Sequence, residues 1–463
     1  MNRRLPSTWD IKGLTPDVAD SLNQMYSGIV HELGRSGDMV QYATIPTSTG
    51  INNAITKLTT DVGVVILPLP LYTANTTITM RDGLIMIGMG ARIEYTILTG
   101  TVIQASMATF IPVIDWNGSY GAHAMNFAIQ GNATASHGIK MAVAGLTQGP
   151  HLRGIKIWNF THTDSIGWEL RGCIGGIYED VYISECNAGK LVGQSSGGTD
   201  SNLNTWIQYQ GRVCTKYGAR FTHSCTASKE LNPRIESNVM DGLIIEGANG
   251  LTIDNGYFEN NATGSLIAVP THGILTFTSG SRKASTDPGL EVGDTITGAI
   301  SGSTAIIQAV HATSGWWADG TMAGDIYISD RSAAFQAENL NVGTDLNVAT
   351  IAADWHRGMR DIITYRGINV DANPGGSTYL NHVKIRDCYF YINPTLALGA
   401  GDFEHIDLYR LAEVITVDGC HFLGDVASAL RDDGTCYGIK LGNRIATGKT
   451  WNHTAAKWKD QDW

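Results

Sequence analysis

A short strand-and-turn pattern recurs along this chain of 463 residues, and it constrains the fold more than any other feature. In each copy an apolar residue is followed by an outward position, a short turn of Asp, Asn, Glu, Gly or Cys, and usually an aromatic residue. The copies begin at Ile157, Ile183, Ile253, Ile385 and Val417. Their intervals are 26 residues from 157 to 183, 70 from 183 to 253 and 32 from 385 to 417. These fit one, about three and one repeat of roughly 20 to 35 residues, a period typical of stacked supersecondary units.

The segments within the repeats have the two-residue periodicity of strands. In residues 243–247 and 251–255, alternate apolar residues point one way, and Glu246 and Asp254 point the other. Gly, Asn and Asp break the strands every few residues, because they tolerate the left-handed backbone of tight corners. No helix-length periodic segment separates the strands, which argues against βαβ folds. We therefore expect an all-β, parallel β-helix, with a sandwich or barrel as the alternative.

Composition narrows the classes of partner. The chain has 54 Gly and only 16% charged residues, as expected of a solenoid of short strands. Its net charge of -11 argues against nucleic acid or an anionic membrane as a partner and favours a sugar-like ligand. It has no apolar run long enough to span a bilayer, and its first residues lack the apolar core of a secretion signal.

The seven cysteines indicate packing rather than cross-linking. Cys186, Cys388 and Cys420 occupy the same place in the repeat, which predicts a buried ladder of free thiols and assembly in a reducing cytoplasm. The sequence has no zinc-ligand spacing, Walker loop or dinucleotide fingerprint, so neither a metal nor a cofactor is expected.

The repeat and its interruption divide the chain. Residues 272–352 break the repeat and have the pattern of a small antiparallel β module. Removing those 81 residues reduces the 132-residue interval from 253 to 385 to 51, about two coils. A helix is predicted over residues 14–34, either packed on the end of the solenoid or serving in attachment or trimerisation. The predicted units are residues 1–44, an N-terminal attachment or trimerisation segment; 45–271, the first part of the β-helix; 272–352, the inserted module; 353–445, the second part; and 446–463, a Trp-rich cap or subunit contact.

The opening of the repeat region resembles a known family. A short amphipathic helix over residues 50–58 precedes an apolar strand ending in Leu-Pro, a Tyr-containing strand and a Gly-x-Gly turn at 88–90. This order is similar to that of right-handed parallel β-helix proteins of the pectate-lyase superfamily, particularly bacteriophage tailspikes and polysaccharide depolymerases. The resemblance covers residues 45–270 and 360–440.

That resemblance implies a homotrimer in a virion tail, assembled in the host cytoplasm and attached to the virion through its N-terminal segment. It implies that the partner is a bacterial surface polysaccharide, which the protein binds, and that depolymerisation of this polysaccharide is the candidate activity. A non-catalytic receptor-binding adhesin is the alternative, and a free polysaccharide lyase is the third interpretation, since the same fold hosts lyases, hydrolases and binders.

Candidate catalytic residues are carboxylates, because glycoside hydrolysis uses two of them about 5 to 9.5 Å apart. Neighbouring coils lie about 4.8 Å apart, so outward carboxylates on adjacent coils fall within that range. The densest cluster consists of Glu236, Asp241, Glu246, Asp254 and Glu259, of which strand parity directs the last three outward. A second cluster contains Asp402 and Glu404, and His162 with Asp164 resembles a general base and its orienting acid. Each of these residues is also typical of a solvated surface.

Candidate sugar-binding residues combine aromatic rings with a cation. Trp206, Tyr209 and Arg212 are predicted to lie in a break between coils, where loops commonly shape a groove. Trp316 and Trp317 lie at the Gly-flanked centre of the predicted module, where they can stack on a sugar ring. The alternative for this pair is a local core or a subunit contact.

Overall fold

The computed structural model describes most of the chain from residue 39 onward. The described residues are 39–58, 62–94, 97–116, 118–194, 198–222, 225–239, 241–246, 248–261, 273–281, 283, 289–291, 293–329, 331–355, 360–365, 382–391, 404–408, 414–423, 428–432, 437–445, 450–452 and 458–460. The helix predicted over residues 14–34 lies outside these residues.

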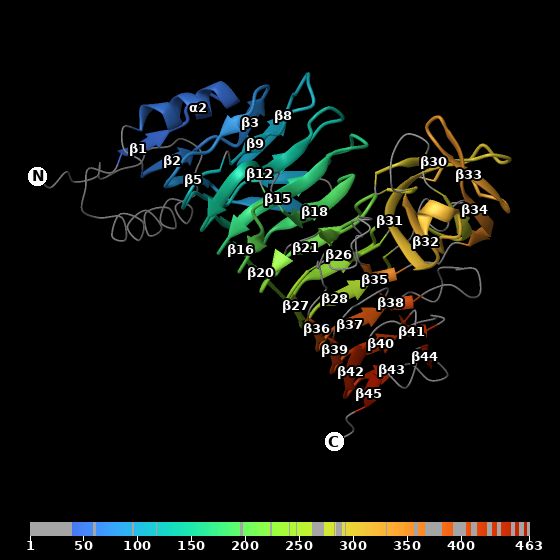
Figure 1. Cartoon of the computed structure of the whole chain (residues 1–463). Coiled ribbons are helices and arrows are strands. Elements are labelled where there is room, and N and C mark those ends of the chain that lie inside the picture. Colours follow the sequence, from blue (N-terminus) through green and yellow to red (C-terminus); the bar gives the residue numbers. More distant parts are fainter. Residues whose placement is uncertain are drawn as a thin grey trace, which may run out of the picture.

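Three long parallel sheets form a solenoid, in which each strand pairs with its equivalent in the coils before and after (Figure 1). Sheet A consists of β1 (Met39–Tyr42), β2 (Gly63–Leu67), β5 (Leu84–Gly88), β10 (His123–Met125), β13 (His151–Arg153), β16 (Ile177–Glu179), β20 (Thr205–Ile207), β24 (Lys229–Leu231), β27 (Thr252–Asp254), β36 (Val383–Arg386), β39 (Val414–Asp418), β42 (Tyr437–Leu441) and β45 (Trp458–Asp460).

Sheet B consists of β3 (Leu71–Ala74), β8 (Val102–Ala105), β11 (Ala128–Gln130), β14 (Lys156–Trp158), β17 (Tyr182–Ser184), β21 (Gln210–Arg212), β25 (Arg234–Glu236), β28 (Tyr257–Glu259), β37 (Tyr389–Tyr391), β40 (His421–Leu423) and β43 (Arg444–Ile445). Sheet C consists of β4 (Ile78–Thr79), β9 (Ile114–Asp115), β12 (His137–Gln148), β15 (Ile166–Ile174), β18 (Ala188–Gly193), β22 (Ala219–Phe221), β26 (Leu243–Glu246), β35 (Arg360–Tyr365), β38 (Glu404–Leu408), β41 (Ser428–Asp432) and β44 (Thr450–Asn452), with β19 (Ser201–Asn202) and β23 (Cys225–Thr226) pairing beside it. The predicted parallel β-helix is thus confirmed.

The corners of the solenoid explain the sequence repeat. In the coil of residues 252–261, β27 ends at Asp254, Asn255 turns the chain with φ 53°, and the buried Gly256 leads into β28. After β28 the same arrangement recurs, because Asn260 has φ 49° and Asn261 is buried. Left-handed backbone of this kind favours Asn and Gly. One coil therefore contains the strand-and-turn pattern twice, once after sheet A and once after sheet B.

This double occurrence corrects the alignment of the repeats. Ile157 and Ile183 lie in sheet B, whereas Ile253, Ile385 and Val417 lie in sheet A. Ile253 and Ile385 are direct partners in neighbouring strands, so one coil separates them and not the expected two. The sequence could not distinguish the two corners, because both turn the chain with the same small set of residues.

Side chains from all three sheets fill one continuous core inside the solenoid. Aromatic residues stack along its axis, as in the parallel rings of Phe258, Phe390 and Phe422. The six described cysteines form no disulfide bonds and are buried, as expected. Their ladder is divided between two corners, however, because Cys186 and Cys214 follow sheet B while Cys388 and Cys420 follow sheet A.

Helix α2 (Ser48–Lys57) covers the N-terminal end of this core (Figure 1). The hydroxyl of Thr47 accepts a hydrogen bond from the amide of Gly50 at 3.1 Å, which caps the helix. Ile51, Ala54 and Ile55 are buried within the solenoid core. The short amphipathic helix expected at residues 50–58 is therefore present, and it seals the first coil.

The predicted inserted module is a closed antiparallel barrel with its own core (Figure 1). It contains β29 (Gly273–Gly280), β30 (Thr295–Gly298), β31 (Thr304–Ser314), β32 (Ala323–Ser329), β33 (Glu338–Val342) and β34 (Asp345–Trp355), with a short 3₁₀ helix, η2 (Trp317–Asp319). A hairpin of β6 (Ala91–Glu94) and β7 (Ile97–Gly100) completes the described elements. The chain leaves the solenoid after β28, forms the barrel, and rejoins the solenoid at β35. The barrel therefore interrupts a single coil.

Candidate functional site

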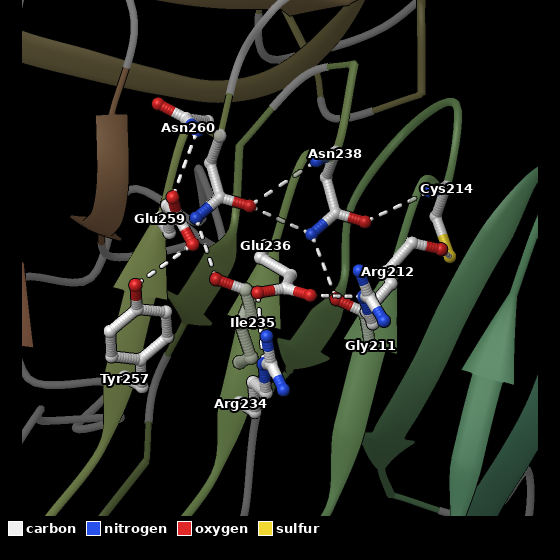
Figure 2. A network of polar contacts seen from close by, with 11 residues as sticks. Gly211, Arg212, Cys214, Arg234, Ile235, Glu236, Asn238, Tyr257, Glu259 and Asn260 are labelled. Carbon is white, nitrogen blue, oxygen red and sulfur yellow. Dashed lines mark hydrogen bonds and ion pairs between the residues drawn. The ribbon is translucent and has the colours of Figure 1, made fainter. Parts of the chain in front are cut away.

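A polar cluster lies on the outer face of sheet B, on three neighbouring strands (Figure 2). In β25 and β28 the middle residue is buried within the core, so the first and third residues face outward. Arg212 is the register partner of Glu236, and Glu236 is the register partner of Glu259. Neighbouring parallel strands are about 4.8 Å apart. Stacking of the coils thus brings two carboxylates of different coils side by side.

Glu236 lies between two arginines. Its side chain is 3% exposed and forms ion pairs with Nε of Arg212 and, at 2.9 Å, with Nε of Arg234. The two arginine side chains are 35% and 48% exposed, so both guanidinium groups reach the surface. Because both oxygens of Glu236 are engaged by cations, this carboxylate fixes the two guanidinium groups in place rather than facing a ligand itself.

Glu259 is the more accessible carboxylate of the cluster. It accepts hydrogen bonds from the hydroxyl of Tyr257 at 2.9 Å and from Nδ2 of Asn260 at 3.2 Å. Burial, together with the hydrogen bond and charge of Glu259, raises the pKa of Tyr257 to about 12. The phenol therefore keeps its proton at neutral pH and remains a hydrogen-bond donor to Glu259.

Aromatic rings extend the cluster toward the next coil. The rings of Tyr257 and Tyr389 stack with centroids 5.4 Å apart and planes 3° apart. The guanidinium of Arg234 lies 5.7 Å from the Tyr257 ring centroid. A flat aromatic surface beside charged groups suits the apolar face and the hydroxyl groups of a sugar ring.

Two buried asparagines, Asn238 and Asn261, support the cluster from the corner after sheet B, and Figure 2 shows Asn238 beside the charged residues. Asn238 accepts a hydrogen bond from the amide of Cys214 at 2.9 Å and donates to the carbonyl of Gly211 at 3.1 Å. It also donates to Oδ1 of Asn261 at 2.8 Å, and Asn261 donates to the carbonyl of Ile235 at 2.9 Å. These bonds tie three coils together at the corner after sheet B, so the strands that carry the charged residues are held in fixed register.

None of the other predicted carboxylates lies on β21, β25 or β28. Asp254 faces outward on sheet A and pairs with Arg386 at 2.6 Å, on a different face of the same coil as Glu259. Asp241 is buried. Glu246 and Glu404 lie in sheet C, in β26 and β38, and their side chains lie outside the described part of the structure. Asp402 lies outside the described residues.

Two of the predicted sugar-binding aromatics are core residues. Trp206 is 0% exposed and Tyr209 is 1% exposed. Trp206 is the inward middle residue of β20 and packs against the rings of Tyr178 and Phe221. The expectation that Trp206 and Tyr209 lie in a surface groove is wrong, because the corners are so short that both residues fall at inward positions. Arg212 does reach the surface.

The two tryptophans of the inserted barrel differ from each other. Trp316 is 72% exposed. Trp317 instead packs against the barrel core and stacks on Phe277, with ring centroids 5.8 Å apart. The local-core alternative therefore holds for Trp317, and sugar stacking remains a prediction for Trp316.

The expected pair of His162 and Asp164 is not a base with its orienting acid. The amide of Asp164, not its carboxylate, donates to Nδ1 of His162 at 3.2 Å. The imidazole lies against the ring of Phe110, with centroids 4.4 Å apart.

Sequence reasoning missed Arg234, Tyr257 and Tyr389. The first two precede Glu236 and Glu259 by two residues, a spacing that places each on the same face of its strand as the carboxylate. That spacing could have identified both residues from the sequence. Tyr389 had no such signal, because it becomes the partner of Tyr257 only across the inserted barrel.

A second missed cluster lies on sheet C, where Glu169 contacts Nε2 of His137 at 3.1 Å and Nε of Arg171 at 2.6 Å. Burial alone would raise the pKa of Glu169, but the hydrogen bond and charge of His137, followed by those of Arg171, lower it to about 2. Nδ1 of His137 is also within 2.9 Å of the hydroxyl of Ser136. Every charged group of this cluster has a partner, so its arrangement favours a structural role.

We expect Glu169→Gln to remove part of the acid sensitivity of the fold. Since the pKa of Glu169 falls from 4.5 to about 2 on folding, its contribution is present above pH 4.5 and is lost as pH falls toward 2. At about 1.4 kcal/mol per pKa unit, this amounts to about 3 kcal/mol. Urea denaturation at pH 7 and at pH 3 measures about 2 kcal/mol of this, because pH 3 is still one unit above the folded pKa, and Glu179→Gln, whose side chain is 35% exposed, is the control. A Glu169→Gln protein that loses as much stability between these pH values as the wild type contradicts the assignment.

Comparison with known proteins finds similarity among solved structures only. No family model matches it, and no curated protein matches its sequence. Among solved structures, the A-module of a mannuronan C-5 epimerase from Azotobacter vinelandii is 10% identical over 94% of this chain and 99% of its own, with a TM-score of 0.38. An alginate lyase from Paenibacillus sp. is 9% identical over 91% of this chain and 99% of its own, with a TM-score of 0.42.

The enzymatically active domain of tailspike protein 2 of bacteriophage CBA120 is 8% identical, with a TM-score of 0.46. It matches 88% of this chain, which spans 45% of that chain. Likeness at these values does not reach beyond the general course of the solenoid. The chemistry depends on side chains, which differ between chains so distant.

Two further observations concern the described residues. No helix among them has the length and apolar character needed to cross a membrane. No three or more of their His, Cys, Asp and Glu side chains are grouped so that they could hold a metal ion.

Proposed function

We propose that this protein binds a bacterial surface polysaccharide on the outer face of sheet B and cleaves it by hydrolysis, with Glu259 as the residue that transfers the proton. The observation that carries the proposal is the pairing of Glu236 and Glu259 on adjacent coils, with Arg212 and Arg234 fixed beside them. Tyr257 and Tyr389 supply the surface on which a sugar ring stacks.

The cluster assigns different roles to its charged groups. Glu236 is too buried to touch a sugar, so it holds Arg212 and Arg234 at the surface, where their remaining N–H groups donate to hydroxyl oxygens of the glycan. Glu259 donates its proton to the glycosidic oxygen as the glycosidic C–O bond breaks, and a water molecule bonds to the anomeric carbon and returns a proton to Glu259. Tyr257 keeps Glu259 oriented through its hydroxyl.

Hydrolysis is favoured over β-elimination by the state of two groups. Elimination from a uronic acid needs a base at C5 and a cation free to neutralise the carboxylate. Tyr257 is a poor base, since its pKa is raised to about 12. Both arginines already neutralise Glu236. The products distinguish the two reactions.

The test is incubation of the full chain with a panel of purified capsular polysaccharides, O-antigens and exopolysaccharides. We expect one of them to release reducing ends without the absorbance of an unsaturated uronate. Appearance of that absorbance would instead identify a lyase and overturn the assignment of hydrolysis. A heated sample of the same protein is the control for spontaneous breakdown.

A non-catalytic adhesin is the second candidate function, and the burial of Glu236 favours it. Glycoside hydrolysis ordinarily uses two accessible carboxylates, whereas Glu236 is 3% exposed and both its oxygens are engaged. A protein that retains a polysaccharide on a column and releases it unchanged supports this second function.

Assembly as a homotrimeric tailspike-like component of a virion tail, formed in the host cytoplasm and attached through the N-terminal segment, is part of the same proposal. It is supported by the family resemblance of residues 45–270 and 360–440. Light scattering at micromolar concentration tests the trimer, and a monomeric mass is the result that excludes it.

A further inference from the structure

The turn between β31 and β32 presents Trp316 to solvent on the inserted barrel. Its side chain is 72% exposed, while the next residue, Trp317, packs against the barrel core. Because this large apolar ring is exposed to water, the fold lacks the stabilisation that its burial would contribute, about 25 cal/mol for each Å² of apolar surface. An indole exposed in this way is available to bind a partner.

Trp317 holds the turn against the barrel core. Its ring stacks on Phe277 with the two planes 12° apart. It also fills the space beside Gly280 and Gly289, where an added Cβ atom would lie only 2.5 Å from the indole. The contact therefore needs glycine at both positions, and it fixes the backbone that carries Trp316.

Hydrogen bonds within the turn fix its conformation. Oδ1 of Asp319 accepts from the amide of Thr321 at 3.0 Å and from its hydroxyl at 2.6 Å. The hydroxyl of Thr321 in turn lies 3.1 Å from the amide of Trp316, which donates to it. Gly315 has φ 81°, and its position is so close to the carbonyl of Thr321 that a Cβ atom would lie 2.1 Å away. Trp316 is therefore held outward before any ligand arrives, which lowers the entropic cost of binding.

The surroundings of Trp316 fit a sugar better than a protein surface. The other residues of the turn, Ser314, Gly315, Ala318, Asp319, Gly320 and Thr321, are small or polar. A stable protein interface buries about 1,200–2,000 Å² with an apolar centre. The equally prominent Ile300 and Leu346 lie elsewhere in the barrel, in the turn between β30 and β31 and near the start of β34. One flat ring next to a carboxylate matches the apolar face and hydroxyl groups of a single pyranose.

We propose that Trp316 and Asp319 form an accessory sugar-binding site, which holds the same polysaccharide as the sheet B cluster; this inference rests on the proposed function. The barrel is inserted directly after β28, the strand that carries Glu259. A polymer bound at Trp316 is thereby tethered to the coil that contains the carboxylates, and two linked contacts raise the affinity for a long chain without new contacts at either one.

Retention on an immobilised array of capsular polysaccharides, O-antigens and exopolysaccharides tests the site. The array is probed with Glu259→Gln protein, which leaves the glycan intact, with and without Trp316→Ala. We expect Trp316→Ala to weaken retention about tenfold, equivalent to about 1.4 kcal/mol, and Trp316→Phe to restore most of it. Leu346→Ala is the matched control, because Leu346 is 70% exposed near the start of β34 in the same barrel.

The second measurement is made with Glu259 intact. Trp316→Ala should hydrolyse short oligosaccharides at the wild-type rate and lose efficiency only on the long polymer. Unchanged retention of Trp316→Ala on the array overturns the accessory site. A fall in oligomer mass by light scattering also overturns it and assigns Trp316 to a contact between copies. The wild-type protein could show no hydrolytic activity while its retention on the array still depends on Trp316. That result would support the accessory site and refute only the catalytic proposal.

Discussion

Glu259→Gln is expected to slow depolymerisation by about 10²- to 10⁴-fold, the usual contribution of a general acid or base. Gln is isosteric with Glu and can still accept the hydrogen bond from Tyr257, but it cannot gain or lose the proton. The variant should therefore keep the fold and the affinity for the polymer. Release of reducing ends over time measures the rate, and array retention measures the binding.

Asp254→Asn is the matched control for Glu259→Gln. Asp254 lies five residues earlier in the same coil, but on sheet A, where its carboxylate pairs with Arg386. Its side chain is 27% exposed and that of Arg386 is 44% exposed, so loss of this pair should change stability by less than about 1 kcal/mol. Equal rates for Glu259→Gln and the wild type would remove Glu259 from the mechanism. A loss of rate in Asp254→Asn would move the site to sheet A.

Glu230→Ala is expected to destabilise the solenoid by about 3–5 kcal/mol, because it leaves a buried ammonium group without its counter-ion. Lys190 and Glu230 form an ion pair inside the core, with side chains 0% and 2% exposed. The ammonium is also enclosed by aromatic rings, at 4.2 Å from Trp206, 4.1 Å from Tyr209 and 5.0 Å from Phe221. Burial lowers the pKa of Lys190 to about 8, although the charge of Glu230 opposes the shift.

The double variant Lys190→Met with Glu230→Leu separates the cost of the lone charge from the value of the pair. Replacing both charges by apolar groups of similar volume removes the buried charge entirely, so we expect most of the lost stability to return. Urea denaturation midpoints compare the wild type, Glu230→Ala and the double variant. A double variant as unstable as Glu230→Ala would show that the ion pair itself stabilises this core.

The sequence was a good guide wherever a property is local. Strand parity correctly directed Asp254 and Glu259 outward, because side chains alternate along a strand and these strands contain only three residues. The inserted module was recognisable, because Gly-rich turns and longer alternating segments replace the short repeat between residues 272 and 352. The helix at the start of the solenoid was recognisable as a short amphipathic segment over residues 50–58.

The sequence was a poor guide to which faces residues share. Trp206 and Tyr209 resembled a surface groove, yet both are core residues, because a two-residue corner places them inside the solenoid. Asp254 and Glu259 are neighbours in the chain but lie on different sheets. Glu236 and Glu259 lie 23 residues apart, and that separation places them in register only if each coil has the observed length.

What the sequence by itself determined is the repeating unit: short strands with one apolar face, turned by residues that accept left-handed backbone. Only the tertiary structure decided which coils meet and what their side chains share. Tyr257 stacks on Tyr389 across the whole inserted barrel, and Lys190 pairs with Glu230, which lies 40 positions later in the chain. The reason is physical. Alternation and corner conformation arise from neighbouring residues, whereas the register between coils arises from hydrogen bonds and packing over the complete length of each turn of the solenoid.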